Sequence, residues 1–162
     1  MKKLWLFAGL VATFLGTLSI TANAAKDEGS YDDAIEARQS LMQVYKYYWF
    51  TLNQMSKGKI KYDAEIASIA AESLLASVRL DQTHMWPEGS HSENPANRKN
   101  TTLPAFWKAS PEDVAKADKR MLDSVSEIQK VAGQGREQLK AAMRKVNSGC
   151  KGCHDDYRKK DD

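Results

Sequence analysis

Cys150-Lys151-Gly152-Cys153-His154 lies near the end of the 162-residue chain and suits one turn of helix with its reactive groups on one side. On a helix, Cys150 and Cys153 are one turn apart, so each thiol can form a thioether to one vinyl group of the same haem. His154 follows at once and brings its imidazole towards the iron as the proximal ligand. Two cysteines with this spacing and a following histidine are typical of c-type haem attachment. The stretch therefore predicts one haem c, covalently bound through Cys150 and Cys153.

Three alternative interpretations account for less of this stretch. A zinc site needs about four ligands, but there is no second cysteine pair, and His84 and His91 lie in a segment predicted to be a loop. A thioredoxin-like motif opens a helix after a strand, whereas this one closes a long charged helix. A plain disulfide would leave His154 without a role.

The first 24 residues carry the features of a cleaved signal peptide. Lys2 and Lys3 precede an apolar run from residue 4 to residue 20, and Ala22-Asn23-Ala24 supplies a small-x-small cleavage site. The mature protein is expected to be one domain over residues 25–162. The alternative, an uncleaved membrane anchor, fits poorly with the polar residues that directly follow the cleavage site. The chain is therefore predicted to be bacterial and exported to the periplasm, the compartment expected for covalent haem attachment.

Charge and hydropathy exclude two kinds of partner. Signal cleavage removes two lysines and no acidic residue, which lowers the formal charge from +3 to about +1. Acidic and basic residues are interspersed, which is typical of an ordinary solvated surface, so no nucleic acid partner is expected. Beyond the signal no apolar run is long enough to span a bilayer, and no membrane association is predicted after cleavage.

Four amphipathic segments predict an all-α fold. Apolar residues recur at spacings of three and four in residues 31–55, 62–83, 111–132 and 136–159. Asp32 or Asp33, Asp63 and Ser110 are placed to cap the first three helices. The buried side of the second helix is predicted to carry Ile66, Ile69, Ala70, Leu74 and Val78.

The long connection between the second and third helices sets the topology. Residues 84–111 contain all four prolines and lose the helical periodicity. A loop of this length in a compact domain is usually functional, and it is expected to fold over the haem edge. The other two connections are short, which predicts an antiparallel four-helix bundle with a long loop between helices 2 and 3.

The first helix carries two candidate haem contacts, Arg38 and Met42, four residues apart on one face. An arginine in an apolar stripe needs an anion, and a haem propionate is the natural partner. The alternative is an arginine at the surface edge with a snorkelling stem. Met42 is expected over the distal side of the iron, opposite the proximal ligand, or else in plain core packing. Tyr47 and Tyr48 widen the apolar surface, which suggests that a second subunit covers this helix.

Several stretches, at residues 37–42, 57–58, 62–64, 86–90, 104–107 and 150–158, carry a resemblance to one family. Together they resemble the cytochrome c′ family, the class II c-type cytochromes, over essentially the whole mature chain. The resemblance implies a homodimer packed through the first two helices. It also implies a five-coordinate iron that is open mainly to small gases such as nitric oxide or carbon monoxide. The stretches that carry it are Ala37-Arg38-Gln39-Ser40-Leu41-Met42, Lys57-Gly58 with Tyr62-Asp63-Ala64, Trp86-Pro87-Glu88-Gly89-Ser90, Pro104-Ala105-Phe106-Trp107 and residues 150–158.

The resemblance also assigns roles to individual residues. Arg38 matches the family's arginine on the propionate side, and Gln39 matches the adjacent haem-contacting position. Arg158 matches the arginine beyond the proximal histidine, where its charge would tune the imidazole. The family's loop contacts to haem fall at Thr101 and Thr102.

Met42 matches the position that blocks the distal side, and here two functions stay open. Some relatives with methionine there keep a five-coordinate iron, which would make the protein a gas-binding haem protein. Low-spin relatives use methionine as the sixth ligand, which would make it a simple electron carrier with a redox protein partner. No acidic or histidine side chain is placed on the inner face of the first helix near Met42, so no enzymatic turnover is predicted.

Overall fold

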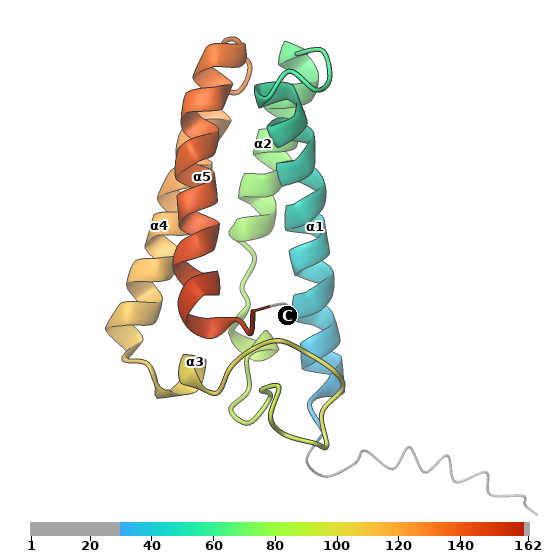
Figure 1. Cartoon of the computed structure of the whole chain (residues 1–162), viewed down its shortest axis with the longest axis vertical. Coiled ribbons are helices and arrows are strands. Elements are labelled where there is room, and N and C mark those ends of the chain that lie inside the picture. Colours follow the sequence, from blue (N-terminus) through green and yellow to red (C-terminus); the bar gives the residue numbers. More distant parts are fainter. Residues whose placement is uncertain (1–29, 161–162) are drawn as a thin grey trace, which may run out of the picture.

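The computed structural model describes residues 30–160, so the predicted signal peptide and the predicted start of the mature chain lie outside the described residues. Four long helices run side by side as an antiparallel bundle, which confirms the predicted fold (Figure 1). The four are α1 (Asp32–Ser56), α2 (Ala64–Val78), α4 (Pro111–Val131) and α5 (Arg136–Tyr157). The long connection between α2 and α4 holds a 3₁₀ turn, η1 (Thr83–Met85), and a single helical turn, α3 (Ala105–Lys108).

Each long helix packs against two others: α1 and α4 both contact α2 and α5. The fully buried core lies towards the end that holds the two short connections, α1 to α2 and α4 to α5 (Figure 1). It is built from Leu52, Met55, Leu74, Val125, Ile128, Leu139, Met143 and Val146, with alanines of α2 between them. The start of α1, the end of α5 and the long connection gather at the opposite end (Figure 1). None of the helices in residues 30–160 combines the length and the apolar character needed to cross a membrane.

Two of the predicted helix caps are confirmed. Asp63 accepts a hydrogen bond from the backbone N–H of Ile66 at 2.9 Å, and the Ser110 hydroxyl accepts one from Asp113 at 3.1 Å. These bonds satisfy backbone donors that a helix start leaves without a partner. Caps of this kind depend on three or four consecutive residues, which is why the sequence alone predicts them.

The predicted cap of the first helix is wrong. Tyr31 occupies the N-cap position, and neither Asp32 nor Asp33 caps the helix, because both lie in its first turn. Asp32 instead accepts a hydrogen bond from the backbone N–H of Arg98 at 2.6 Å. Arg98 lies 66 positions from Asp32 in the sequence, so no local pattern predicts this hydrogen bond.

The second helix differs from its prediction in its length and in which residues face the core. It ends at Val78 rather than near Thr83. Ile66 and Ile69 were expected inside, yet they are 50% and 55% exposed. The buried residues of α2 are Ala67, Ala70, Ala71, Leu74 and Leu75, so Ala70 and Leu74 face the core as predicted. The segment is apolar on two sides, so its periodicity did not reveal which side faces the core.

Helices α4 and α5 approach each other most closely beside the cysteine motif. A Cβ atom at Gly149 would lie 2.9 Å from the Ser124 hydroxyl and 3.2 Å from the Cα atom of Met121. At the other end of the bundle, the Tyr62 hydroxyl donates to the carbonyl of Ala132 at 2.7 Å and accepts from the N–H of Gly135 at 2.9 Å. These contacts fix α5, and with it the motif, against its neighbours.

Candidate functional site

Cys150 and Cys153 lie in the last turns of α5 as free, partly buried thiols. Burial raises the pKa of the Cys150 thiol, and burial followed by the negative charge of Asp118 raises the pKa of Cys153 to about 11. Redox-active and metal-binding cysteines need lowered pKa values, because the thiolate is the reactive form. Among the described residues no group of three or more histidine, cysteine or acidic side chains is placed to hold a metal ion, which disfavours the zinc interpretation. The raised pKa of both thiols disfavours the thioredoxin-like interpretation.

His154 follows on the same helix and is exposed at the surface. Packing around its ring lowers the pKa of His154, and the positive charge of Arg158 lowers it further. The neutral imidazole is the form that ligates iron, because one ring nitrogen then offers its lone pair. The local electrostatics therefore fit the predicted role of His154 as an axial ligand.

The contact between α1 and α5 sets Met42 level with His154. The indole N–H of Trp49 donates to the side-chain oxygen of Asn147 at 2.7 Å, so these two side chains meet across the antiparallel pair. Met42 lies seven residues before Trp49, and His154 lies seven residues after Asn147. Seven residues are about two helical turns, so both side chains return to the faces that already meet. Met42, which is partly buried, is thus level with His154 along the α1–α5 pair.

The fully buried core stops where the motif begins. Along α5, buried residues continue to Gly149, and none of the residues from Cys150 to Tyr157 is fully buried. Tyr45, Met121 and Cys150 are only partly buried, although they pack against the core. These side chains pack against the core but stay partly exposed. Such a surface is expected where a bulky, mostly apolar group covers it. The residues of this half of the bundle therefore fit a haem.

Hydrogen-bond acceptors from the long connection surround the guanidinium of Arg38. It is 2% exposed. Its Nη1 donates to the Met85 carbonyl at 3.2 Å and to the Ser90 hydroxyl at 2.6 Å. Its Nη2 donates to the Ser90 carbonyl, and more weakly to the Asn100 side-chain oxygen at 3.5 Å. The arginine is therefore buried, which contradicts the alternative of a snorkelling arginine at the surface edge.

The positive charge of Arg38 has only neutral partners among residues 30–160. The rings of Trp86 and Trp107 lie 4.9 Å and 5.9 Å from its guanidinium carbon, and no carboxylate pairs with it in that range. Burial lowers the pKa of Arg38 to about 10, so it stays protonated at neutral pH. A buried cation without an anion is costly. The carboxylate of a haem propionate would supply this anion, and that role of Arg38 stays a prediction.

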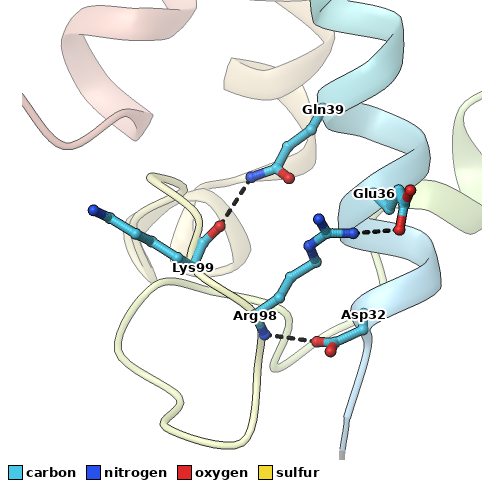
Figure 2. A network of polar contacts seen from close by, with 5 residues as sticks. All are labelled: Asp32, Glu36, Gln39, Arg98 and Lys99. Atoms are coloured by element: carbon cyan, nitrogen blue, oxygen red, sulfur yellow. Dashed lines mark hydrogen bonds and ion pairs between the residues drawn. The ribbon is translucent and has the colours of Figure 1, made fainter.

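Gln39 and the first turns of α1 hold the loop in place (Figure 2). The Gln39 amide donates to the carbonyl of Lys99 at 3.0 Å. The guanidinium of Arg98 pairs with Glu36, and its backbone N–H binds Asp32. The structure thus gives Gln39 a partner in the loop, and its predicted contact with haem stays a prediction.

Thr101, Thr102 and Arg158 are brought together just beyond the motif. Thr102 and Arg158 form an isolated antiparallel bridge, and the N–H of Lys159 donates to the carbonyl of Thr101 at 2.8 Å. The backbone therefore turns from helix to extended chain at Arg158, which ends α5 at Tyr157. The arrangement ties the loop to the chain segment one turn after His154.

The sequence analysis missed two residues of this region, Ser90 and Asn100. Ser90 is fully buried and binds Arg38 through both its hydroxyl and its carbonyl. Asn100 is 9% exposed, and its side-chain oxygen accepts from Arg38 and from the N–H of Thr102 at 3.1 Å. Ser90 lies in one of the stretches that resemble the family, but no role was predicted for it, and Asn100 shows only the small polar character common to exposed loops.

Comparison with known proteins places these observations in a family. The family model described as cytochrome c′ matches residues 33–158. A relative named cytochrome c-554, from Cereibacter sphaeroides, is 33% identical over 136 residues, which cover 84% of this chain and 100% of that protein. Cytochrome c′ from Alcaligenes xylosoxydans is 26% identical over 130 residues, which cover 80% of this chain and 95% of that protein.

Two solved structures have the same fold. Cytochrome c′ from Rhodobacter sphaeroides superimposes with a TM-score of 0.75 at 27% identity, over 80% of this chain and 97% of that one. A ferrous variant of the Alcaligenes cytochrome c′ with bound nitric oxide gives a TM-score of 0.67 at 23% identity, over 80% of this chain and 95% of that one.

Proposed function

Because the chain belongs to the cytochrome c′ family, we propose that it is an exported haem protein whose iron is five-coordinate and binds small gases such as nitric oxide and carbon monoxide. Covalent haem c is a property of the family, so the prediction of one haem c on the two cysteines is confirmed. When bound, the haem supplies an iron position for a diatomic gas and a one-electron redox couple.

The side chains have distinct proposed roles around this group. Cys150 and Cys153 hold the haem covalently, and His154 is its proximal ligand. Arg38 neutralises a propionate, with its guanidinium kept in place by the loop. Further proposed haem contacts come from Gln39, Thr101 and Thr102, while Arg158 acts on the proximal imidazole through its charge.

One observation carries the proposal for gas binding, namely the position of Met42 level with His154. An apolar side chain at the distal position excludes water and anions, while a small neutral gas can still enter by displacing it. The nitric oxide complex of the Alcaligenes relative supports the same chemistry here. No acid or base on this face of α1 is placed for proton transfer, so we propose binding rather than turnover.

The same position of Met42 also supports a second candidate function. A thioether is itself a haem ligand, and an axial methionine raises the reduction potential. If Met42 binds the iron, the protein is a low-spin electron carrier that serves a redox protein partner. The two functions differ in the coordination number of the iron.

Substitutions at Met42 separate the two functions. We expect the ferrous spectrum of Met42→Leu to stay high-spin and like that of the wild type, because the iron does not use the thioether. Carbon monoxide should bind faster to Met42→Ala, since the smaller side chain opens the distal side. Met143→Leu, at a core methionine that is 2% exposed, is the matched control. Conversion from low spin to high spin in Met42→Leu would establish the electron carrier instead.

We also propose that the protein is a homodimer through α1 and α2. Outward-facing apolar side chains on these two adjacent helices include Val44, Tyr47 and Phe50 of α1 and Ile66 and Ile69 of α2, all between 40% and 67% exposed. Burial of such side chains releases roughly 25 cal/mol for each Å² removed from water. The two helices also contact each other, so their apolar surfaces can join in one interface.

The proposed location is the bacterial periplasm, with residues 1–24 removed. The relatives compared above are bacterial cytochromes of the c type, which supports export. Intact-mass spectrometry of the protein from a periplasmic extract tests this proposal. We expect the mass of a chain beginning at Ala25 plus one haem, and a full-length chain held in the membrane would contradict it.

A further inference from the structure

We propose that His91 is a second side chain that binds the haem propionate. The Nδ1–H group of His91 donates a hydrogen bond to the carboxylate that Arg38 neutralises. The inference rests on the proposed haem site but not on the coordination number of the iron. It concerns the loop of residues 91–100.

The first observation is that Nδ1 of His91 is buried and has no hydrogen-bond partner among residues 30–160. It is the one buried side-chain nitrogen or oxygen in that range with this property. Leaving a buried polar group without a partner is costly, so native structures nearly always supply one. A partner that the polypeptide does not provide is therefore expected at this atom.

The second observation places His91 beside the buried charge of Arg38. Its neighbour Ser90 binds the guanidinium through its hydroxyl and its carbonyl. The imidazole packs edge-on against Trp107, with ring centroids 6.1 Å apart, and the same indole ring lies 5.9 Å from the guanidinium carbon. His91 and Arg38 thus share one aromatic wall.

The third observation is that the loop holds His91 in place. The Asn97 side chain donates to the carbonyl of His91 at 3.1 Å, and the N–H of the next residue, Ser92, donates to the carbonyl of Thr102 at 2.8 Å. Thr102 in turn pairs with Arg158, beyond the proximal histidine. His91 is therefore fixed at the end of the bundle where the haem is attached.

A carboxylate satisfies both groups at once. Its two oxygens accept several hydrogen bonds, so it can take one from His91 while its negative charge compensates Arg38. A neutral imidazole with its proton on Nδ1 donates this bond without adding a second buried cation. Donation draws negative charge away from the propionate, which stabilises ferrous over ferric haem and raises the reduction potential.

Reduction potentials of the haem-loaded variants test the proposal. His91→Leu should lower the midpoint potential, because the donor is lost and the propionate charge is left concentrated. His91→Asn, whose amide nitrogen can take the place of Nδ1, should restore most of the shift. His84→Leu, at an exposed histidine of η1, should match the wild type. A His91→Leu potential equal to that of the wild type would overturn the proposal.

The protonation state of the ring gives an independent check. Long-range ¹H–¹⁵N NMR of the diamagnetic ferrous protein, with carbon monoxide added if the iron is five-coordinate, shows which nitrogen of His91 carries the proton. We expect Nδ1, with its proton protected from exchange. A proton on Nε2 alone would refute the proposal, because Nδ1 could then donate nothing. Failure of the gas-binding function would show separately, as a ferrous spectrum that carbon monoxide leaves unchanged.

Discussion

Replacing Arg38 by leucine removes the group that joins α1 to the long connection. Its guanidinium donates hydrogen bonds to the Met85 carbonyl and to both oxygens of Ser90. Hydrogen bonds from a charged donor contribute about 1.5–3 kcal/mol each, and buried acceptors left without a donor add to the loss. Relief of the buried charge offsets part of this sum, so we expect a net loss of about 3 kcal/mol in the free energy of unfolding. For a domain of this size that corresponds to a melting temperature lower by about 10 °C.

Urea unfolding of the haem-loaded protein, followed by tryptophan fluorescence, measures this loss. Haem attachment itself should be unchanged, because the thioethers are covalent. Arg38→Lys is the matched variant, since it keeps the charge but cannot bind Ser90 through a planar fork, and it should lose less than Arg38→Leu. Hydrogen exchange should accelerate within residues 85–100. An unfolding free energy for Arg38→Leu within about 1 kcal/mol of the wild type would refute this reasoning, as would failure to attach haem.

Three further predictions concern packing, pH and assembly. Gly149→Ala should cost about 1–3 kcal/mol in urea unfolding, because its Cβ meets the backbone of α4, whereas Gly152→Ala meets only a flexible arginine end and should cost little. Burial raises the pKa of Tyr45 to about 12, so the native state keeps a proton that the unfolded state loses above about pH 10. Stability should therefore fall as the pH rises from about 10 to about 12, and Tyr45→Phe should reduce that slope; a parallel slope in both proteins would contradict this. Replacing Ile66 and Ile69 by aspartate should shift sedimentation from dimer to monomer, and a wild type that is already monomeric would end the dimer proposal.

Features that depend on neighbouring residues were predictable from the sequence. The cysteine motif, the caps at Asp63 and Ser110 and the course of the four helices all depend on spacings of three or four residues. Arg38 was also predictable as a buried cation, because a charge inside an apolar stripe faces the interior and needs a partner there.

Features that depend on contacts across the chain were not predictable. Ser90 lies 52 residues from Arg38, and Arg98 lies 66 residues from Asp32, so their hydrogen bonds appear only once the loop is folded. The prediction that Ile66 and Ile69 are buried was wrong for another reason. Alanines allow close helix contact at low cost, so Ala67, Ala70 and Ala71 share the core face of α2 with its leucines, and the isoleucines stay outside.

The absorption spectrum of the purified ferrous protein, recorded before and after carbon monoxide is added, tests the central claim most directly. With His154 as the single axial ligand, the Soret band should be broad and should sharpen at once when the gas binds. Sharp, split visible bands that do not change with carbon monoxide would contradict it. The thioether of Met42 would then be the sixth ligand, and the protein would be an electron carrier.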